Sequence, residues 1–131
     1  MKKIMMVFAF LFAVLGTNAQ TYKFKTYAFA YKQLASFGWT DWTDWQQSEM
    51  LVVISLDRGV INVYSRDTQE YDIVEYEGEE RDREGNSMKF LCVNEDGLRC
   101  NIRLRTQNDG NRQLYVDFSD VMWVYGLTER N

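Results

Sequence analysis

The fold of this protein is decided by residues 88–105, which read MKFLCVNEDGLRCNIRLR. Apart from the central NEDG, apolar residues occupy the even positions, and after the glycine the odd positions are polar. Alternation with a period of two indicates β-strands with one buried face, because successive side chains point to opposite faces. The loop Glu95-Asp96-Gly97, a type I turn followed by a left-handed glycine, joins two such strands in register. The predicted cross-strand pairs are Cys92 with Cys100, Phe90 with Ile102 and Met88 with Leu104.

Two further turns extend this pattern. The turn Asn108-Asp109-Gly110 sets Leu104 against Leu114, Ile102 against Val116 and Cys100 against Phe118. A two-residue loop, Arg58-Gly59, places Leu56 beside Ile61 and Ile54 beside Val63. Because a slip of one residue turns a whole strand inside out, the agreement of three turns on one inner face predicts the register.

The rest of the chain indicates an all-β domain. Eight segments have strand character: 22–31, 50–56, 60–65, 69–77, 87–94, 98–106, 112–118 and 121–127. Short strands with tight turns are typical of an antiparallel meander, since parallel strands need crossovers of a dozen or more residues. We expect about eight strands, closed into a small barrel of lipocalin or calycin type or folded as a two-sheet sandwich.

Composition excludes several classes of protein. The 131 residues suffice for one domain with a hydrophobic core. The absence of histidine removes Ser-His-Asp and Cys-His catalysis, and two cysteines cannot build a structural zinc site. The pI of about 4.8 argues against nucleic-acid binding, which needs a basic face. We therefore expect no cofactor, no metal and no nucleic-acid partner.

The first 19 residues resemble a secretory signal peptide. Lys2 and Lys3 precede an apolar run over 4–15, and small and polar residues follow, with cleavage expected after Ala19. The run is shorter than the roughly 20 residues of a transmembrane helix, so no stable membrane span is expected after cleavage. No lipobox cysteine follows the run. The prediction is a periplasmic or secreted domain, 20–131, with 13 basic and 19 acidic residues and a net charge of about −6.

The predicted register places Cys92 and Cys100 directly opposite each other on the inner face. Such pairs have Cβ atoms about 4.5–5.5 Å apart, slightly wide of disulfide geometry. Exported chains meet an oxidising compartment, which favours a disulfide. The alternative is a pair of buried thiols that act as small hydrophobic residues.

The segment Trp39-Thr40-Asp41-Trp42-Thr43-Asp44-Trp45 is the most unusual stretch. One interpretation is an aromatic ligand-binding platform: indoles stack on sugar rings or cations, and Asp41 and Asp44 accept hydrogen bonds from hydroxyl groups. The other interpretation is structural, with the tryptophans plugging one end of the β-domain.

A basic stripe is predicted on the outer face. Arg99, Arg103 and Arg105 share the outer side of one strand, and the register brings Lys89 and Tyr115 beside them. This group is a weak candidate for binding a carboxylate, sulfate or phosphate; alternatively it is a solvated surface. The charged loop 77–86 lacks the EF-hand spacing and is expected to be a solvated hairpin tip.

Several features together resemble a known group of proteins. They are the lysine start and NAQ ending of the leader, the Trp-x-x-Trp region, INVYS at 61–65 with YDI at 71–73, and LYVDFSDVMWVY at 114–125. The chain resembles small exported all-β proteins of Bacteroidota that carry a signal peptide. The resemblance implies the compartment and no particular activity.

These features predict an exported, non-enzymatic binding or interaction module for a small apolar or glycan ligand, or for a protein. The ligand is expected at the Trp39–Trp45 segment or, by analogy with lipocalins, in the barrel mouth. One alternative is a glycan hydrolase that uses Asp41 or Asp44. Another is an interaction domain that pairs through an unprotected strand, starting at Tyr22 or ending at Leu127.

Overall fold

The computed structural model of the chain describes residues 21–129, so the predicted leader lies outside the described part. These residues form strands, turns and loops, with no helix among them, which confirms the all-β prediction. The ten strands are β1 (Thr21–Ala35), β2 (Gly38–Trp39), β3 (Gln46–Gln47), β4 (Leu51–Ser55), β5 (Val60–Tyr64), β6 (Gln69–Arg81), β7 (Gly85–Asn94), β8 (Arg99–Gln107), β9 (Arg112–Asp117) and β10 (Val121–Glu129).

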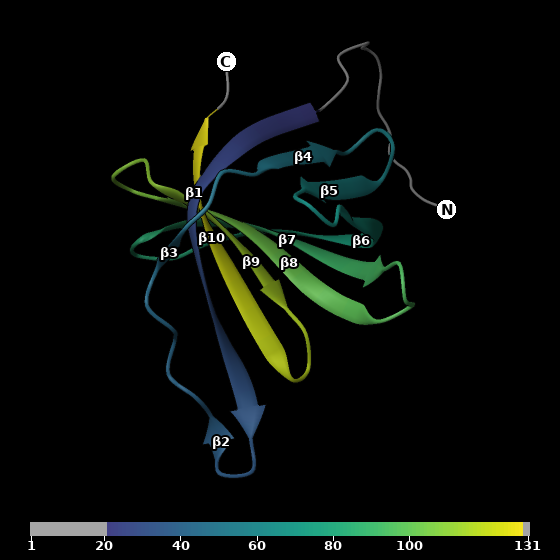
Figure 1. Cartoon of the computed structure of the whole chain (residues 1–131). Helices are drawn as coiled ribbons and strands as arrows, with labels where there is room; N and C mark the ends of the chain where they lie inside the picture. The colour runs from purple at the N-terminus through teal and green to yellow at the C-terminus, as the bar shows by residue number, and fades with distance from the viewer. Residues whose placement is uncertain (1–20, 130–131) are drawn as a thin grey trace.

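Eight of these strands close into an antiparallel barrel. Going round it, the order is β1, β4, β5, β6, β7, β8, β9 and β10, and β10 pairs with β1 to complete the circle (Figure 1). The short strands β2 and β3 pair with the remaining edge of β1. The barrel prediction is therefore confirmed, and the two-sheet sandwich is wrong.

The predicted register is confirmed for the β7–β8–β9 meander. Cys92 pairs with Cys100, Phe90 with Ile102, Met88 with Leu104, Leu104 with Leu114 and Ile102 with Val116. The β8–β9 ladder ends at the pair Asn101–Asp117, one step before the predicted Cys100–Phe118 pair. Gly97 and Gly110 both have positive φ, as the predicted turns require.

The predicted β4–β5 register is wrong by two residues. Ile54 pairs with Ile61 and Val52 with Val63, because the connection is a four-residue loop, 56–59, and not two residues. Within it the Gly59 N–H donates to the Leu56 carbonyl at 3.2 Å, so Leu56 belongs to the turn. A two-residue shift leaves each side chain on its predicted face, so alternation could not reveal it.

The strands proposed as unprotected edges are both paired on two sides. Tyr22 lies opposite Ile54 of β4, and Leu127 lies opposite both Thr26 of β1 and Arg112 of β9. The prediction of an open edge is therefore wrong for Leu127 and for β1 from Phe24 onward, while Tyr22 pairs on its β4 side among the described residues. The barrel closes where β1 and β10 hydrogen-bond to each other, and this pairing leaves neither strand as a free edge there.

The barrel interior is filled by a continuous hydrophobic cluster to which all eight barrel strands contribute. Its most completely buried members include Phe90, Ile102 and Leu114, each with no exposed surface. An eight-stranded barrel has an interior just wide enough for side chains to fill. The cluster therefore makes the interior a packed core.

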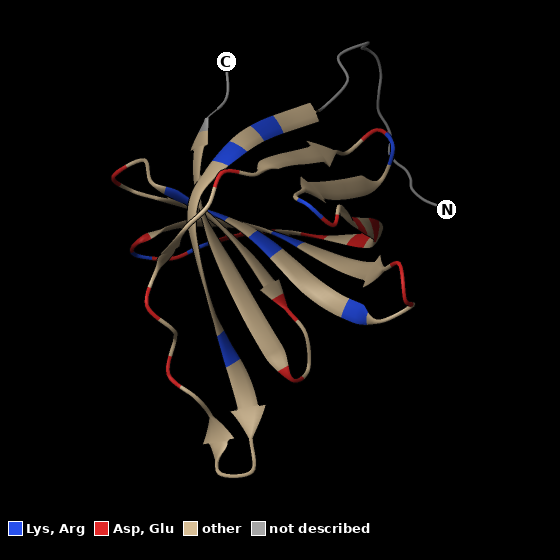
Figure 2. Ribbon diagram, in the orientation of Figure 1, with Lys and Arg blue, Asp and Glu red and all other residues tan. Residues whose placement is uncertain are grey.

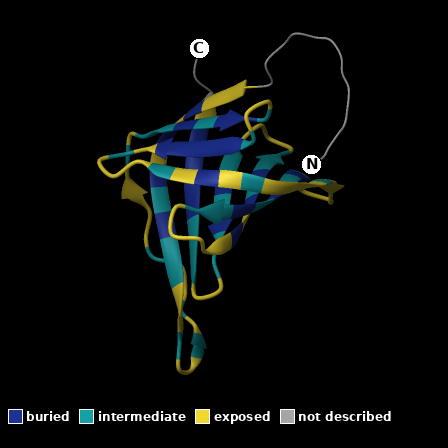
Figure 3. Cartoon of the chain, turned by 90° about the vertical axis from the view of Figure 1, so that its right-hand side faces the viewer, coloured by how far each residue is buried: buried dark blue, intermediate teal, exposed yellow. Residues whose placement is uncertain are grey.

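One hairpin projects from this body. The β1–β2 turn extends beyond the barrel (Figures 1 and 3), and Phe37 at its tip is 80% exposed. The stretch 33–40 contains no charged residue, as the uncoloured tip in Figure 2 shows. The chain turns back at this tip and runs along the outer edge of β1.

Substitution of one buried leucine and one exposed leucine tests the described packing of the core. Leu114→Ala should lower the free energy of unfolding by about 2–5 kcal/mol, because Leu114 is fully buried. Leu98→Ala should change it by less than about 0.5 kcal/mol, because Leu98 is 57% exposed in a turn. Urea denaturation followed by circular dichroism measures both; similar losses for the two variants would contradict the described packing.

Candidate functional site

A β-bulge at Tyr27 sets which side chains of β1 face outward beyond it. The register with β10 shifts between Thr26 and Ala28. The inward residues change from even positions, as at Phe24, to odd positions, as at Phe29, because a bulge inserts one unpaired residue. The outer face of the second half of β1 therefore carries four residues: Ala28, Ala30, Lys32 and Leu34.

Two threonines fasten the tryptophan segment to β1. The Thr40 N–H donates to the Gln33 carbonyl at 2.8 Å, and Thr40 Oγ1 accepts the Gln33 N–H at 3.0 Å. Thr43 makes the same two hydrogen bonds with Tyr31, at 2.9 and 3.0 Å. With β2 and β3 on either side, these bonds hold the segment along the β1 backbone.

The tryptophans of this segment are exposed. Trp39, Trp42 and Trp45 have 36%, 39% and 53% of their surface accessible. The structural interpretation, in which they plug one end of the barrel, is therefore wrong. Asp41 and Asp44, between the tryptophans in sequence, are exposed as well.

A continuous series of contacts between cations and aromatic rings runs from this segment across the outer wall. Lys32 Nζ lies 5.7 Å from the ring centroid of Trp39 and 4.9 Å from that of Trp42. Trp42 meets Tyr115 of β9 edge-on, with ring centroids 6.4 Å apart. The Arg103 guanidinium carbon lies 4.3 Å from the centroid of the Tyr115 ring. We call these five residues, Trp39, Lys32, Trp42, Tyr115 and Arg103, the aromatic platform.

Small side chains make room for the platform. Ala30, Val124 and Tyr115 lie in one row across β1, β10 and β9. Ala30 and Val124 are buried although they face outward, and β1 and β10 separate the tryptophan segment from β9. We infer that Trp42 covers these two residues on its way to Tyr115. The platform thus unites the predicted Trp segment and part of the predicted basic stripe, while sequence reasoning missed Lys32.

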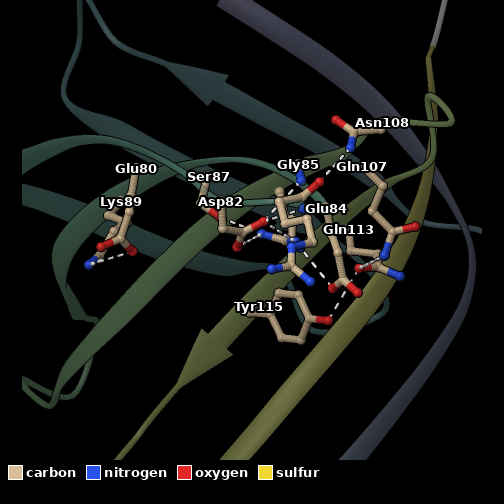
Figure 4. Close-up of polar contacts among 12 residues, drawn as sticks. Glu80, Asp82, Glu84, Gly85, Ser87, Lys89, Gln107, Asn108, Gln113 and Tyr115 are labelled. Atoms are coloured by element: carbon tan, nitrogen blue, oxygen red, sulfur yellow. Dashed lines mark hydrogen bonds and ion pairs between the residues drawn. The ribbon is translucent and has the colours of Figure 1, made fainter.

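The basic stripe pairs largely with the protein's own carboxylates. Arg105 binds both oxygens of Asp82 at 3.1 Å and Ser87 Oγ at 3.2 Å. Figure 4 shows Asp82 and Ser87 within this polar cluster. Lys89 lies 3.7 Å from Glu80. Arg103 contacts Asp117 at 3.2 Å, whereas Arg99 is exposed at the start of β8. These ion pairs leave fewer donors for the external anion proposed from the sequence.

Asp117 is poorly solvated beneath this surface. Its Oδ2 accepts from Arg103, but its buried Oδ1 has no hydrogen-bond partner among the described residues. Burial raises the pKa of the Asp117 carboxyl, and the charges of Arg103 and Lys32 oppose that rise. Both cations of the platform therefore help to keep this carboxylate ionised.

Asp82 organises the β6–β7 turn. Its Oδ1 accepts the N–H groups of Glu84 and Gly85 at 2.8 and 3.0 Å, while Arg105 approaches the same carboxylate. The hydrogen bond from Arg105, with those from the turn backbone, lowers the Asp82 pKa to about 2. Asp82 therefore joins the turn to β8.

Acid titration tests this linkage. Because the folded pKa of Asp82 is below its ordinary value of 3.8, its stabilising contribution is present above about pH 4 and is lost as pH falls toward 2. Asp82→Asn should lower the urea midpoint at pH 7, and its difference from the parent should shrink between pH 4 and pH 2. Asp67→Asn, an exposed matched control, should show no such trend. A constant difference for Asp82→Asn would contradict the assignment.

Cys92 and Cys100 lie opposite each other as predicted, but both are free and buried. The sequence left two alternatives open, a disulfide or a pair of buried thiols. This structure has the pair of buried thiols, and the disulfide does not form in it. Burial raises the pKa of Cys92 and raises that of Cys100 to about 11. Thiols with raised pKa values carry little thiolate, the reactive form, at neutral pH.

Thiol labelling tests this arrangement. At pH 8 a thiol-exchange reagent such as DTNB should react slowly with the folded protein, because both sulfur atoms are buried and protonated. In urea it should titrate two thiols per chain. Fewer than two thiols in urea, recovered after reduction, would show that the cysteines are bonded.

The chain has no match among family models, curated proteins or solved structures. Within residues 21–129 there is no helix of the length and apolarity needed to cross a membrane. The same residues place no three His, Cys, Asp or Glu side chains together as metal ligands.

Proposed function

We propose that the protein is an exported, non-enzymatic binding module that holds a glycan against the aromatic platform and the adjoining Trp45. One observation carries this proposal: three exposed indoles belong to a segment that backbone and threonine hydrogen bonds fasten to β1. The leader pattern and the resemblance to exported Bacteroidota proteins support export to the periplasm or beyond the cell.

The chemistry of the segment suits a sugar. Indoles offer a flat apolar face to the rings of a sugar, and neighbouring carboxylates such as Asp41 and Asp44 accept hydrogen bonds from hydroxyl groups. Exposed apolar patches on soluble proteins commonly mark binding sites. Because the segment is already ordered, binding costs little additional conformational entropy.

The packed interior of the barrel also favours a ligand site on the outer wall. Side chains from all eight barrel strands fill the interior, so a small apolar ligand in the barrel mouth has less support than a ligand on the platform. A lipocalin-like internal site would require this cluster to open.

The two alternative functions have less support. A glycan hydrolase needs one carboxyl group kept protonated by its surroundings, whereas Asp41 and Asp44 are both exposed. For strand pairing, the part of β6 beyond its β5 partner, residues 74–81, offers an edge. Two bulges and several glutamates lie along it, and both features hinder pairing with another chain.

Intrinsic tryptophan fluorescence tests the proposal. Titration with soluble oligosaccharides should give a saturable shift, and Trp42→Ala should weaken the affinity at least about tenfold, equivalent to about 1.4 kcal/mol. Tyr64→Ala is the matched control, since Tyr64 is 43% exposed on β5, outside the platform. Circular dichroism and thermal melting establish that both variants fold.

Two results would contradict the proposal. One is the absence of a saturable response to any oligosaccharide in a panel of neutral, acidic and amino sugars. The other is unchanged binding by a folded Trp42→Ala variant. Turnover of an oligosaccharide that disappears in Asp41→Asn or Asp44→Asn would favour the hydrolase.

A further inference from the structure

The tryptophan segment contains a sequence repeat, and its three indoles have different residues of β1 beside them. Trp-Thr-Asp occurs twice, and the two threonines dock two residues apart on β1. Leu34 of β1 pairs with Trp39, and Lys32 Nζ lies over the rings of both Trp39 and Trp42. Ala30 is the outward residue beside the Phe29–Gln46 pair, which directly follows Trp45. The space between Trp39 and Trp42 therefore has a cation from the protein, whereas β1 supplies only a methyl group beside Trp45.

The first pair of indoles, Trp39 and Trp42, shows which chemical group these rings bind. The Lys32 ammonium lies within 6 Å of the ring centroids of both Trp39 and Trp42. Cations are attracted to the negative face of an aromatic ring, most strongly to that of tryptophan. Two indoles that are three residues apart in the tryptophan segment therefore create a position for an ammonium group beside β1.

In the next pair of indoles, Trp42 and Trp45, Lys32 lies over Trp42 alone. Trp45 is the most exposed of the three indoles, and no described Lys or Arg lies over its ring. Asp44, between Trp42 and Trp45 in sequence, is exposed and forms no ion pair with the described residues. Ala30 is buried beneath the segment, so the accessible surface here belongs to the indoles and the carboxylate.

We propose that Trp42, Asp44 and Trp45 bind a protonated amino group, so that the glycan ligand is one that contains free amino sugars. This inference rests on the proposed function and specifies its ligand class. The chain's net charge of −4 attracts cationic ligands, and Asp41 and Asp44 repel acidic ones. A neutral sugar stacks on the same indoles but forms no ion pair with Asp44.

A series of oligosaccharides of equal length and different charge provides the test. Tryptophan fluorescence at low ionic strength should show that glucosamine oligomers bind about fivefold or more tightly than their N-acetylated counterparts, which lack the charge. Uronic acid oligomers should bind more weakly than either. Added sodium chloride should reduce the preference for the amino sugar.

Two variants locate the interaction. Asp44→Asn should abolish most of the preference for the amino sugar, whereas Asp67→Asn, an exposed aspartate with the same change in net charge, should retain it. Lys32→Met should strengthen binding of the amino sugar, because it removes a like charge and vacates the equivalent position between Trp39 and Trp42. Thermal melting verifies that each variant folds.

The outcomes separate this inference from the proposed function. Equal binding of charged and acetylated oligomers would overturn the inference and leave glycan binding intact, whereas failure of every oligosaccharide would overturn both. Tighter binding of uronic acids, or loss of binding in a folded Lys32→Met variant, would assign Lys32 to an acidic ligand instead. Tighter binding of oligolysine than of the amino sugar would overturn the choice of a glycan.

Discussion

Hydrogen bonding between the first and last strands is the constraint on which the rest of the structure depends. The β1–β10 ladder runs from Phe24–Glu129 to Gln33–Val121 and turns a meander of local hairpins into a closed barrel. Closure brings strands that are a hundred residues apart into contact, and it encloses one hydrophobic core. Without it, both strands would expose unpaired backbone groups and the core would lose one wall.

The irregular step in this ladder shapes the outer surface. The bulge displaces Tyr27 onto Gly126, where any Cβ would come within 2.5 Å of the tyrosine ring. Beyond the bulge the outward residues of β1 include small ones, and the tryptophan segment lies against them. The candidate site is thus a consequence of how the barrel closes, because the same strand supplies the seam and the support for the indoles.

The sequence was informative where structure is local and less so where it depends on distant contacts. The β7–β8–β9 register followed from alternation and from Gly97 and Gly110, because each turn fixes its own two strands. The β4–β5 shift was missed because a two-residue slip preserves every face. The bulge, and the contact between Trp42 and Tyr115, join segments far apart in sequence, and no local pattern encodes them. The two threonines were the available signal: hydroxyl residues at a regular spacing suggest side-chain bonds to a neighbouring backbone.

The pairing of β1 with β10 also determines where another molecule or a surface can be attached to the protein. Residues 21 and 129 leave the barrel on adjacent strands at one end, while the β1–β2 hairpin projects from the other (Figure 1). A fusion partner, an affinity tag or a chip linkage joined at either of these positions would hold the molecule by its base. The β1–β2 hairpin would then lie at the end away from the support (Figure 1), so immobilised protein would keep the exposed Trp39 of β2 accessible.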